Sequence, residues 1–437
     1  MAFIPVYILI LGFTIVIDYF AGIWIERTDG KYKKYFLIAS LIANIGVLAV
    51  FKYYNFLNDN LSDLLNSIGY TNKIPRLGLI LPIGLSFHTF QAMAYTIEVY
   101  RGHQKAEHKF GIYALYVMFY PQLVAGPIER PQNLIHQFYE KHTFEYQRVV
   151  EGLKLILWGF FMKLVIADRL AIYVNAVYNN SAQHSGLSLL VATIFFAFQI
   201  YCDFAGYSNI AIGAAKVMGF KLMTNFDRPY LSQSISEFWK RWHISLSSWF
   251  RDYLYISLGG NRVSIPRWYF NLLFVFIISG FWHGANWTFI IWGALNGFYL
   301  VFAIVSENLR KKIDHAFFID QVPWLDRFIK IFTTFILVCL AWIFFRADSL
   351  HGAIDILGKI LAFKGPLFIG TSSFLVYSVA GILFLLMAEL KTEYLNDKFL
   401  FFHHPNSLVR KFSYTSIIIL ILMFGVFDGG QFIYFQF

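Results

Sequence analysis

Charged residues are scarce in this sequence. Only 14% of its 437 residues are Asp, Glu, Lys or Arg, and 58% are hydrophobic, whereas about 25% of the residues in a soluble domain are charged. So few charges cannot cover the surface of a soluble protein of this length. The apolar residues also form continuous runs instead of alternating with polar ones, which favours helices over a barrel of strands. We therefore expect an all-α polytopic integral membrane protein.

Cysteine and several familiar catalytic motifs are also missing. Only Cys202 and Cys339 are present, both in apolar surroundings, so neither a disulfide framework nor a thiolate metal site is expected. The sequence contains no Walker loop, which argues against an ATP-driven transporter, and no Gly-x-Ser-x-Gly or His-Glu-x-x-His motif. The adjacent pair His403 and His404 lacks a set of further metal ligands, so we expect no metal site.

Long apolar runs are abundant. A helix needs about 20 apolar residues to cross a bilayer, and we expect roughly ten to twelve transmembrane or re-entrant helices. The first run has no basic segment before it and is interrupted by Asp18, so we expect a first span or uncleaved anchor, not a signal peptide. Candidate spans lie near residues 3–25, 35–57, 77–99, 151–175, 187–201, 268–282, 286–305, 328–346, 371–389 and 414–428, with shorter apolar pieces near 111–125 and 244–258.

Basic residues outnumber acidic ones, and the formal net charge is +10. In a membrane protein this excess marks cytoplasmic loops and contact with anionic lipid, so membrane lipid is an expected partner and nucleic acid is not. The loops near residues 26–34 and 100–110 are basic, and the intervening loop at 58–76 is more neutral. This alternation predicts an N-terminus outside the cytoplasm.

A histidine interrupts the run from Trp268 to Ser306, which has no Lys, Arg, Asp or Glu. His283 lies in the segment FWHGANW, where a helix break near Gly284 and Asn286 would place it at a helix end lining a cavity. Ionisable groups at membrane depth are costly and are candidates for function, and neutral imidazole can accept a proton from a hydroxyl. The local sequence favours equally a general base and a buried histidine that only hydrogen-bonds a neighbouring helix.

The segment EFWKRWHISLSSWFRDYLYISLGGNR, residues 237–262, is rich in aromatic and basic residues. Helical spacing places Trp239, Trp242 and Leu246 on one side. Trp and Tyr beside Arg and Lys are typical of a membrane interface, and the pattern alone favours a helix that only anchors the fold. His243 adds a second titratable ring, and arginines such as Arg251 are suited to the phosphates of an anionic ligand.

The segment QIYCDFAGYSNIAIGAAKVMGF, residues 199–220, carries Asp203 among small and apolar residues. Small residues let membrane helices pack closely, so we favour a hydrogen-bonded Asp203 in a helix-packing face. Asp18, His88 and Glu98 are further titratable groups in early spans, but they are too dispersed to predict a proton relay.

Several of these segments resemble the membrane-bound O-acyltransferase superfamily, and within it the branch of AlgI-like alginate O-acetyltransferases. The resemblance covers nearly the whole chain and is most specific in RWHISLSSWFRDYLYISLGGNR (241–262) and FWHGANWTFIIWGALNG (281–297). Supporting segments are FKYYNF (51–56), LPIGLSFHTFQAMAY (81–95), QLVAGPIERP (122–131), residues 199–220 and FGVFDGGQFIYFQF (424–437).

The resemblance implies transmembrane helices around a central tunnel, with an acyl donor entering from the cytoplasm and an acceptor from the other side. It assigns the role of general base to His283 and a second catalytic position to His243. His243 or Asn286 is a candidate donor to the oxyanion, and Lys240, Arg241 and Arg251 are candidates for holding the donor's phosphates. The residues expected along the donor or substrate tunnel are Trp239, Arg241, Trp242, Arg251, Asp252, Trp282, Asn286 and Asp203.

The implied function is that of a membrane O-acetyltransferase. It would move acetyl from cytoplasmic acetyl-CoA, a substrate and not a bound cofactor, across a bacterial inner membrane. The acetyl group would serve O-acetylation of an extracytoplasmic polysaccharide such as alginate or peptidoglycan, with an extracytoplasmic SGNH-type acetyltransferase as partner. We expect one membrane domain over residues 1–437, with its motif core at about 199–300.

Two alternatives stay open. A DltB-like branch of the same superfamily moves D-alanine from a carrier protein toward teichoic acid, but the segments SLGGNR and FDGGQFIYFQF favour the acetyl branch. The other alternative is a secondary transporter or flippase without covalent chemistry. Transporters often contain paired interrupted helices in two halves, and no such symmetry is apparent in the sequence.

Overall fold

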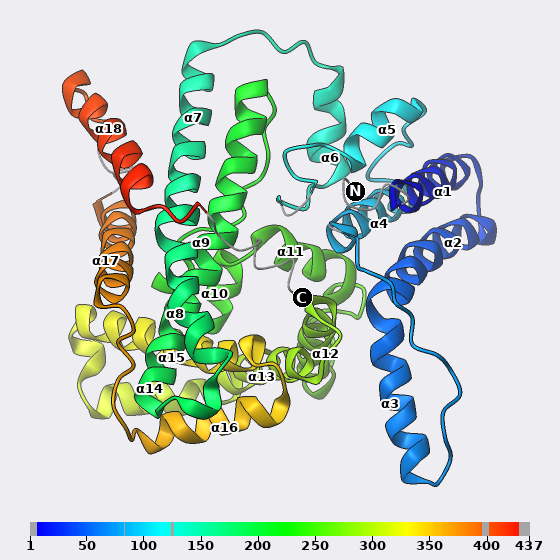
Figure 1. The fold of residues 1–437 in the computed structure, drawn as a ribbon. Coiled ribbons are helices and arrows are strands. Elements are labelled where there is room, and N and C mark those ends of the chain that lie inside the picture. Colours follow the sequence, from blue (N-terminus) through cyan, green and yellow to red (C-terminus); the bar gives the residue numbers. More distant parts are fainter. Residues whose placement is uncertain (1–6, 83, 124–125, 396–401, 428–437) are drawn as a thin grey trace. The chain divides into compact units, whose positions relative to one another are not determined.

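The computed structural model describes residues 7–82, 84–123, 126–395 and 402–427, and the part of the chain within these ranges contains helices and loops but no β-strand. The chain forms two compact units (Figure 1). One comprises residues 1–149 and 215–223, and the other comprises residues 150–214 and 224–437. The prediction of one membrane domain is not tested by this division and stays a prediction.

The N-terminal unit is built around three packed helices, α1 (Tyr7–Arg27), α2 (Lys31–Leu48) and α4 (Leu85–Arg101). A π-helical turn at Ala49–Tyr53 joins α2 to α3 (Tyr54–Ser67). The shorter elements of this unit are α5 (Phe110–Val117), α6 (Pro131–Leu134) and a 3-10 turn at Ile135–Tyr139.

Buried polar side chains join the three central helices of the N-terminal unit. The carboxylate of Asp18 accepts hydrogen bonds from the Ser40 hydroxyl at 2.6 Å and from the Asn44 amide at 2.9 Å. Glu98 lies apart from them and accepts a hydrogen bond from Gln132. Asp18 and Glu98 are thus engaged in separate local contacts, in agreement with the expectation that they do not form one relay.

The larger unit contains the remaining helices (Figure 1). α7 (Tyr146–Phe160) continues through a π-helical turn at Phe161–Ala167 into α8 (Asp168–Tyr178), and α9 (Gly186–Met218) follows. The other elements are α10 (Ile235–Arg241), α11 (Ile244–Trp249), a π-helical turn (Phe250–Tyr255), α12 (Ile265–His283), α13 (Trp287–Val305), α14 (Glu307–Ala316), α15 (Pro323–Arg346), α16 (Leu350–Ala362), α17 (Ser372–Leu395), α18 (Ser407–Phe424) and 3-10 turns at Ser181–Gln183, Pro229–Leu231 and Ile319–Gln321.

Eight helical segments in the described part of the chain are long and apolar enough to cross a membrane. They are Tyr7–Arg27, Lys31–Ser67, Gly186–Met218, Ile265–His283, Trp287–Val305, Pro323–Arg346, Ser372–Leu395 and Ser407–Phe424. They confirm the prediction of an all-α, multi-pass membrane protein.

α7 and α9 approach each other through glycines. A Cβ atom on Gly159 would lie 2.6 Å from the carbonyl oxygen of Gly206, and one on Gly213 would lie 2.6 Å from the carbonyl oxygen of Gly152. Atoms this close cannot coexist without a backbone shift, so only glycine fits these crossing points. This is the close packing by small residues that the segment 199–220 predicts.

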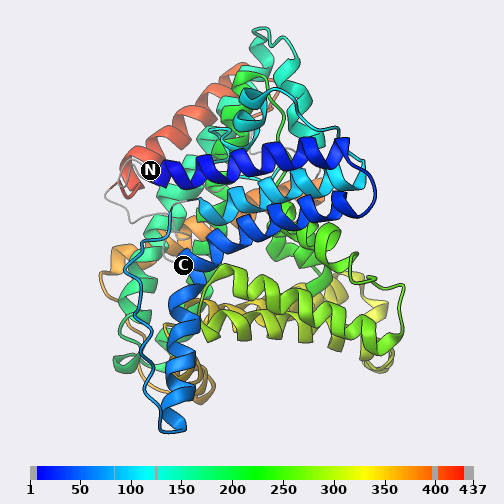
Figure 2. The ribbon, with the colours of Figure 1, turned by 90° about the vertical axis from the view of Figure 1, so that its right-hand side faces the viewer.

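α12 and α13 form a tight antiparallel hairpin, and the two helices lie side by side in Figure 2. The turn begins at Gly284, where a Cβ atom would collide with the ring of Phe289. Asn286 then starts α13, because its side-chain oxygen accepts a hydrogen bond from the Thr288 backbone N–H at 3.0 Å. The hairpin therefore ends in a sharp turn that holds His283 at its tip.

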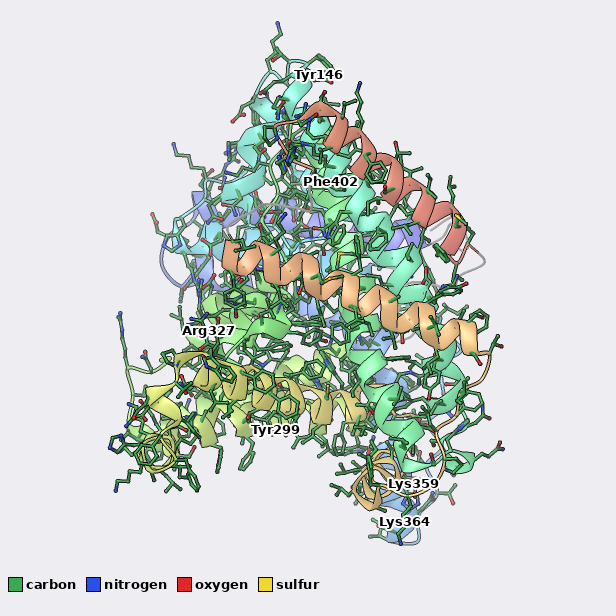
Figure 3. The ribbon with its side chains drawn as sticks, turned by 90° about the vertical axis from the view of Figure 1, so that its left-hand side faces the viewer. Tyr146, Tyr299, Arg327, Lys359, Lys364 and Phe402 are labelled. Atoms are coloured by element: carbon green, nitrogen blue, oxygen red, sulfur yellow. The ribbon has the colours of Figure 1, made fainter. Side chains whose placement is uncertain are left out.

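α15 packs against α13, so α12, α13 and α15 run between the same two ends of the larger unit. One end carries the α12–α13 turn and the end of α15 at Arg346. The other end carries the start of α15 and α14. Figure 3 shows Arg327, near the start of α15, and Lys359 and Lys364, which follow its end, toward opposite ends of this helix group.

Candidate functional site

His283 is the last residue of α12, and only 6% of its surface is exposed. Its ring centre lies 4.8 Å from that of Trp282, 5.0 Å from that of Trp292 and 5.4 Å from that of Phe345. These rings come from α12, α13 and α15. The negative end of the α12 dipole favours a positive charge at this position, so the site suits an imidazole that accepts a proton.

Stacked indoles extend from His283 toward the tryptophan-rich segment. The rings of Trp292 and Trp342 are stacked with centres 5.8 Å apart, and Trp342 lies 5.2 Å from Trp242. Trp239 also contacts Trp292, at 5.7 Å. The structure thus brings the predicted residues Trp239, Trp242 and Trp282 into one aromatic cluster with His283.

His243 lies at the N-terminus of α11 in a left-handed backbone conformation, with φ of 41°. This region costs a residue other than glycine roughly 1–3 kcal/mol and is concentrated at functional sites. Its Nδ1 donates a hydrogen bond to the side-chain oxygen of Asn225 at 3.1 Å, because that oxygen can only accept. Ser245 donates to the same oxygen at 2.9 Å, so Asn225 fixes the ring and the start of α11 together.

The tautomer of His243 limits what its ring can do. With the proton on Nδ1, a neutral ring presents a lone pair and not a donor at Nε2. His243 lies outside the eight candidate spans and is buried, and burial lowers the pKa of its imidazole to about 3. Donation to an oxyanion from Nε2 would require a proton that burial disfavours. The oxyanion role of His243 stays a prediction.

Arg241 is held by acidic side chains. Its guanidinium donates to Glu393 on α17 at 2.9 and 3.2 Å and also pairs with Glu237 at 2.8 Å. A donor phosphate at Arg241 would have to compete with both carboxylates. Arg251 pairs with its neighbour Asp252 at 2.8 Å and is mostly exposed. The tunnel and phosphate roles of Arg241, Arg251 and Asp252 stay predictions.

Asp203 lies in a buried ion-pair group on α9. The ammonium of Lys163 lies 2.6 Å from the Asp203 carboxylate and 2.8 Å from that of Asp168. One cation between two carboxylates compensates for the cost of burying them. This ion pair between packed helices explains why an apolar helix contains a charged residue. A tunnel role for Asp203 stays a prediction.

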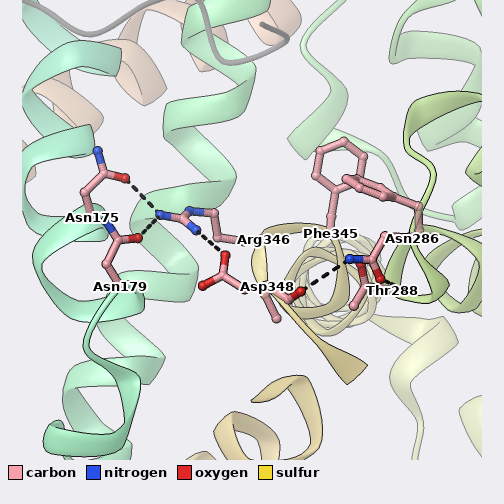
Figure 4. Close-up of a pocket in the computed structure, with 9 residues that line it drawn as sticks. Asn175, Asn179, Asn286, Thr288, Phe345, Arg346 and Asp348 are labelled. Atoms are coloured by element: carbon pink, nitrogen blue, oxygen red, sulfur yellow. Dashed lines mark hydrogen bonds and ion pairs between the residues drawn. The ribbon is translucent and has the colours of Figure 1, made fainter. Parts of the chain in front are cut away.

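Figure 4 shows a polar cavity of about 490 Å³ at the end of α15. Phe345, whose ring contacts His283, also lines this cavity, and the ring of Phe289 packs against Phe345 with centres 4.9 Å apart. Phe345 therefore neighbours both His283 and the cavity. The lining residues are Asn175, Asn179, Asn286, Thr288, Phe289, Phe345, Arg346, Ala347 and Asp348.

Asn286 is the predicted site residue that lines this cavity, and its amide is engaged twice. Its oxygen caps α13, and its nitrogen donates to the carbonyl of Asp348 at 3.3 Å. Sequence reasoning missed Trp292, Trp342, Phe345 and Arg346. Arg346 did carry a signal, since it is the first charged residue after the apolar run that begins at Ile331.

The sequence matches one known protein family and several individual proteins. Residues 101–345 match the sequence profile described as "MBOAT, membrane-bound O-acyltransferase family". The match includes His243, His283 and the segment 199–300 that was predicted as the motif core.

Three bacterial proteins illustrate the similarity to individual relatives. The "Probable alginate O-acetylase AlgI" of Pseudomonas aeruginosa is 39% identical over 79% of this chain, and this chain spans 64% of its length. The "Peptidoglycan O-acetyltransferase" of Helicobacter pylori is 36% identical over 82% of this chain and 71% of its own length. The "Teichoic acid D-alanyltransferase" of Streptococcus thermophilus is 32% identical over 53% of this chain and 58% of its own length.

Proposed function

This chain belongs to the membrane-bound O-acyltransferase family, and on that premise we propose that it is a membrane O-acetyltransferase. It takes acetyl from a cytoplasmic thioester, acetyl-CoA, for O-acetylation of an extracytoplasmic polysaccharide. The observation that carries the proposal is His283, a buried imidazole at a helix end inside the matched segment, in contact with Phe345, which also lines a polar cavity.

The proposed reaction is an acyl transfer in which His283 is the general base. A hydroxyl of the acceptor gives its proton to the imidazole as its oxygen bonds to the acetyl carbonyl carbon. The carbon–sulfur bond of the thioester then breaks, and the thiolate takes the proton from the imidazolium. The acceptor leaves as an acetate ester and the donor as a free thiol. A positioned base contributes about 10²- to 10⁴-fold to such a rate.

The rings around His283 support this chemistry. Trp282, Trp292 and Phe345 exclude water from the base, which limits hydrolysis of the thioester. An aromatic face near an imidazolium also stabilises its charge. The helix dipole of α12 acts in the same direction. These residues would favour the protonated ring that forms during transfer.

Relatives support the acetyl group and the class of acceptor. Two of the relatives described above are named for O-acetylation, one of alginate and one of peptidoglycan. By that analogy we place this protein in a bacterial inner membrane, with an SGNH-type acetyltransferase outside the cytoplasm that completes polysaccharide modification. D-alanyl transfer is the second candidate, favoured by the similarity to the teichoic acid enzyme, which covers a smaller share of this chain.

Transfer of labelled acetyl tests the proposal. Membranes containing the wild-type protein are supplied with acetyl-CoA labelled in the acetyl group, and label in cell-envelope polysaccharide is measured. His283→Ala should lower the initial rate by about 10²- to 10⁴-fold, because it removes the base. Labelled D-alanine on a carrier protein, supplied in parallel, distinguishes the second candidate.

The matched control is His315→Ala, which removes an exposed histidine that pairs with Asp320 at the surface of the same unit. It should retain the wild-type rate. The rates are compared only if the wild-type protein and both variants have equal protein levels and equal unfolding temperatures. Full acetylation by the His283→Ala protein would refute the assignment of the base, and incorporation of D-alanine without acetyl would refute the choice of acyl group.

A further inference from the structure

The segment between α2 and α4 folds as a hairpin of its own, and the proposed acyl transfer makes no use of it. α2, the π-helical turn and α3 form one continuous helical run of 37 residues, Lys31–Ser67. At about 1.5 Å per residue this run is longer than the hydrocarbon core of a bilayer, which is about 30 Å thick. α2 alone, with 18 residues, is close to that thickness. The residues after α2 therefore have to leave the core or change direction.

The chain changes direction at the π-helical turn Ala49–Tyr53. Figure 2 shows α1, α2 and α4 running in one direction and α3 running across them, and α3 also projects away from these helices in Figure 1. α1 and α2 are candidate spans, and α4 packs beside both of them. Residues 54–82, which we call the α3 hairpin, thus leave and rejoin the spans at one face of the membrane. A helix that runs across the spans at this place lies along the membrane surface.

One side of α3 is covered by the extended return segment of the hairpin. The amide of Asn55 donates to the carbonyl of Leu77 at 2.8 Å, and its oxygen accepts from the Leu77 N–H at 2.9 Å. The N–H of Ile74 donates to the Asn72 side chain at 3.0 Å, and its carbonyl accepts from Asn58 at 3.1 Å. Extended backbone outside a sheet needs water or side chains as hydrogen-bond partners. Asparagine side chains take the place of water at both residues.

Another side of α3 is apolar and exposed. Leu57, Leu61, Leu64 and Ile68, which we call the leucine stripe, follow the helical spacing of one face and have exposed fractions of 56, 38, 61 and 61%. A helix at the surface of a soluble protein buries its apolar side and exposes its polar side. α3 does the reverse, because its asparagine side is covered by its own hairpin. The leucine stripe therefore requires an apolar environment from outside the hairpin.

The leucine stripe follows a surface of α2 that faces lipid. Because α2 belongs to a candidate span, exposed apolar side chains on it contact acyl chains. The exposed apolar residues of α2 and the π-helical turn are Ile38, Ile42, Ile45 and Val50. The leucine stripe comes directly after them along the chain, so the apolar surface that contacts lipid extends without interruption into α3.

The charges of the α3 hairpin favour neither an anionic nor a cationic partner. Its charged residues are Asp59, Asp63, Lys73 and Arg76, so its net charge is zero. Asp59 and Arg76 pair with each other at 3.2 Å. Asp63 is exposed, and helical spacing places it on a side of α3 away from the leucine stripe. A helix divided in this way lies in the lipid interface, with its apolar side toward acyl chains and its charge in water.

We propose that the α3 hairpin lies flat in the lipid interface, with the leucine stripe between acyl chains and Asp63 in water. The partner of this surface is the apolar boundary of a bilayer, whatever the charge of the headgroups. The hairpin thereby fixes the depth of α2 and α4 in the membrane. Residues 58–76, expected from the sequence as a loop, are then a surface that binds lipid. This inference does not depend on the proposed acyl transfer.

Fluorescence quenching on the full-length protein in phosphatidylcholine vesicles tests the proposal. Leu64→Cys and Asp63→Cys place a thiol at adjacent exposed positions of α3, and both proteins are labelled with the same small dye before reconstitution. Cys202 and Cys339 are buried, and the wild-type protein measures their background labelling. Iodide quenches a dye in water, whereas a spin-labelled acyl chain quenches a dye in lipid. Compared with position 63, position 64 should be quenched several-fold more by the lipid and several-fold less by iodide.

Two further measurements make the result independent of one substitution and of one lipid. Ile68→Cys, at the end of the leucine stripe, should behave like Leu64→Cys. Replacing part of the phosphatidylcholine by phosphatidylglycerol should leave all quenching unchanged, because the hairpin has no net charge. The labelled proteins are compared only if their unfolding temperatures are equal.

Three outcomes would overturn the proposal. Iodide quenching as strong at position 64 as at position 63 would put the leucine stripe in water. Protection of position 64 from both quenchers would show that protein covers the stripe, such as a second copy of this chain. Lipid quenching that appears only with phosphatidylglycerol would show that headgroup charge, and not the leucine stripe, holds the hairpin on the membrane.

Discussion

At the scale of single residues, the two histidines have different chemical settings. His283 sits at a helix end, and its ring contacts Phe345, which also lines a polar cavity. His243 is enclosed, carries its proton on Nδ1 and is fixed by Asn225. We infer that His283 changes its protonation state during the reaction and that His243 keeps the neutral form.

The lowered pKa of His243 predicts a pH dependence of stability. In the unfolded chain a histidine has a pKa near 6.5, whereas burial lowers the pKa of His243 to about 3. Below pH 6.5 the unfolded chain binds a proton that the folded protein does not. Stability is therefore complete above pH 6.5 and falls as the pH decreases, by about 2 kcal/mol between pH 6.5 and 5.

His243→Asn should remove this contribution, and asparagine tolerates the left-handed backbone at this position. The measurement is the unfolding temperature of the detergent-purified proteins at pH 7 and pH 5. The wild-type protein should lose more stability on acidification than the variant. An equal loss in both proteins would show that His243 becomes protonated in the folded state.

Arg346 shows the limit of prediction from sequence at this scale. His283 is marked as a candidate by its place in a charge-free run, and its role as the base is a prediction from the family resemblance. Arg346 is visible as the first charge after an apolar run, but its partners are not, because Asn175 and Asn179 precede it by about 170 residues and meet it only in the folded chain. Single-sequence patterns describe neighbours along a helix, so a contact of this kind lies outside their reach.

At the scale of elements, the spans near 268–282 and 286–305 agree closely with α12 and α13. They were predictable because Gly284 and Asn286 interrupt a long apolar run. α9 extends to Met218, well beyond the predicted end near residue 201. Asp203 lies within this extension, where Lys163 pairs with it and the helix continues.

Glycines at the α7–α9 crossing should be intolerant of even a methyl group. A Cβ atom on Gly206 would lie 2.8 Å from the carbonyl oxygen of Gly159, so Gly206→Ala should force the helices apart and destabilise the protein by roughly 1–3 kcal/mol. Thermal unfolding in detergent measures the change. Gly358 on α16 has open space around it, and Gly358→Ala should be neutral or stabilising by up to about 1 kcal/mol.

The test compares the changes in stability that the same Gly→Ala substitution causes at residues 206 and 358. Both place one methyl group in a helix and both gain helix propensity. If Gly206→Ala proves as stable as Gly358→Ala, α7 and α9 do not cross as closely as the structure shows.

At the scale of the whole molecule, the composition was sufficient to predict an all-α multi-pass protein. Long apolar runs indicate that a segment lies in lipid, whichever residues it contacts in the folded chain. The overall composition does not determine on which side of the membrane each loop lies. The charge distribution predicts that the end of α15 lies outside the cytoplasm and α14, with Arg310, Lys311 and Lys312, inside. Both orientation and ligand access to the cavity depend on this assignment.

Cysteine labelling tests the orientation. Asp348→Cys and Lys311→Cys each introduce a thiol at an exposed position, with side-chain exposures of 85% and 70%, while Cys202 and Cys339 are buried. A membrane-impermeant maleimide should label position 348 in intact spheroplasts and position 311 only after permeabilisation. The reverse pattern would place the cavity on the cytoplasmic side.

The stacked indoles described beside His283 also make the site observable without any added probe. Trp292 and Trp342 lie face to face, and Trp242 follows at 5.2 Å. Rigidly packed aromatic rings give near-ultraviolet circular dichroism that vanishes when packing loosens while helices remain. Trp342→Leu should reduce this signal and leave the far-ultraviolet spectrum intact. A change of packing around His283 should therefore be visible as a change in this spectrum.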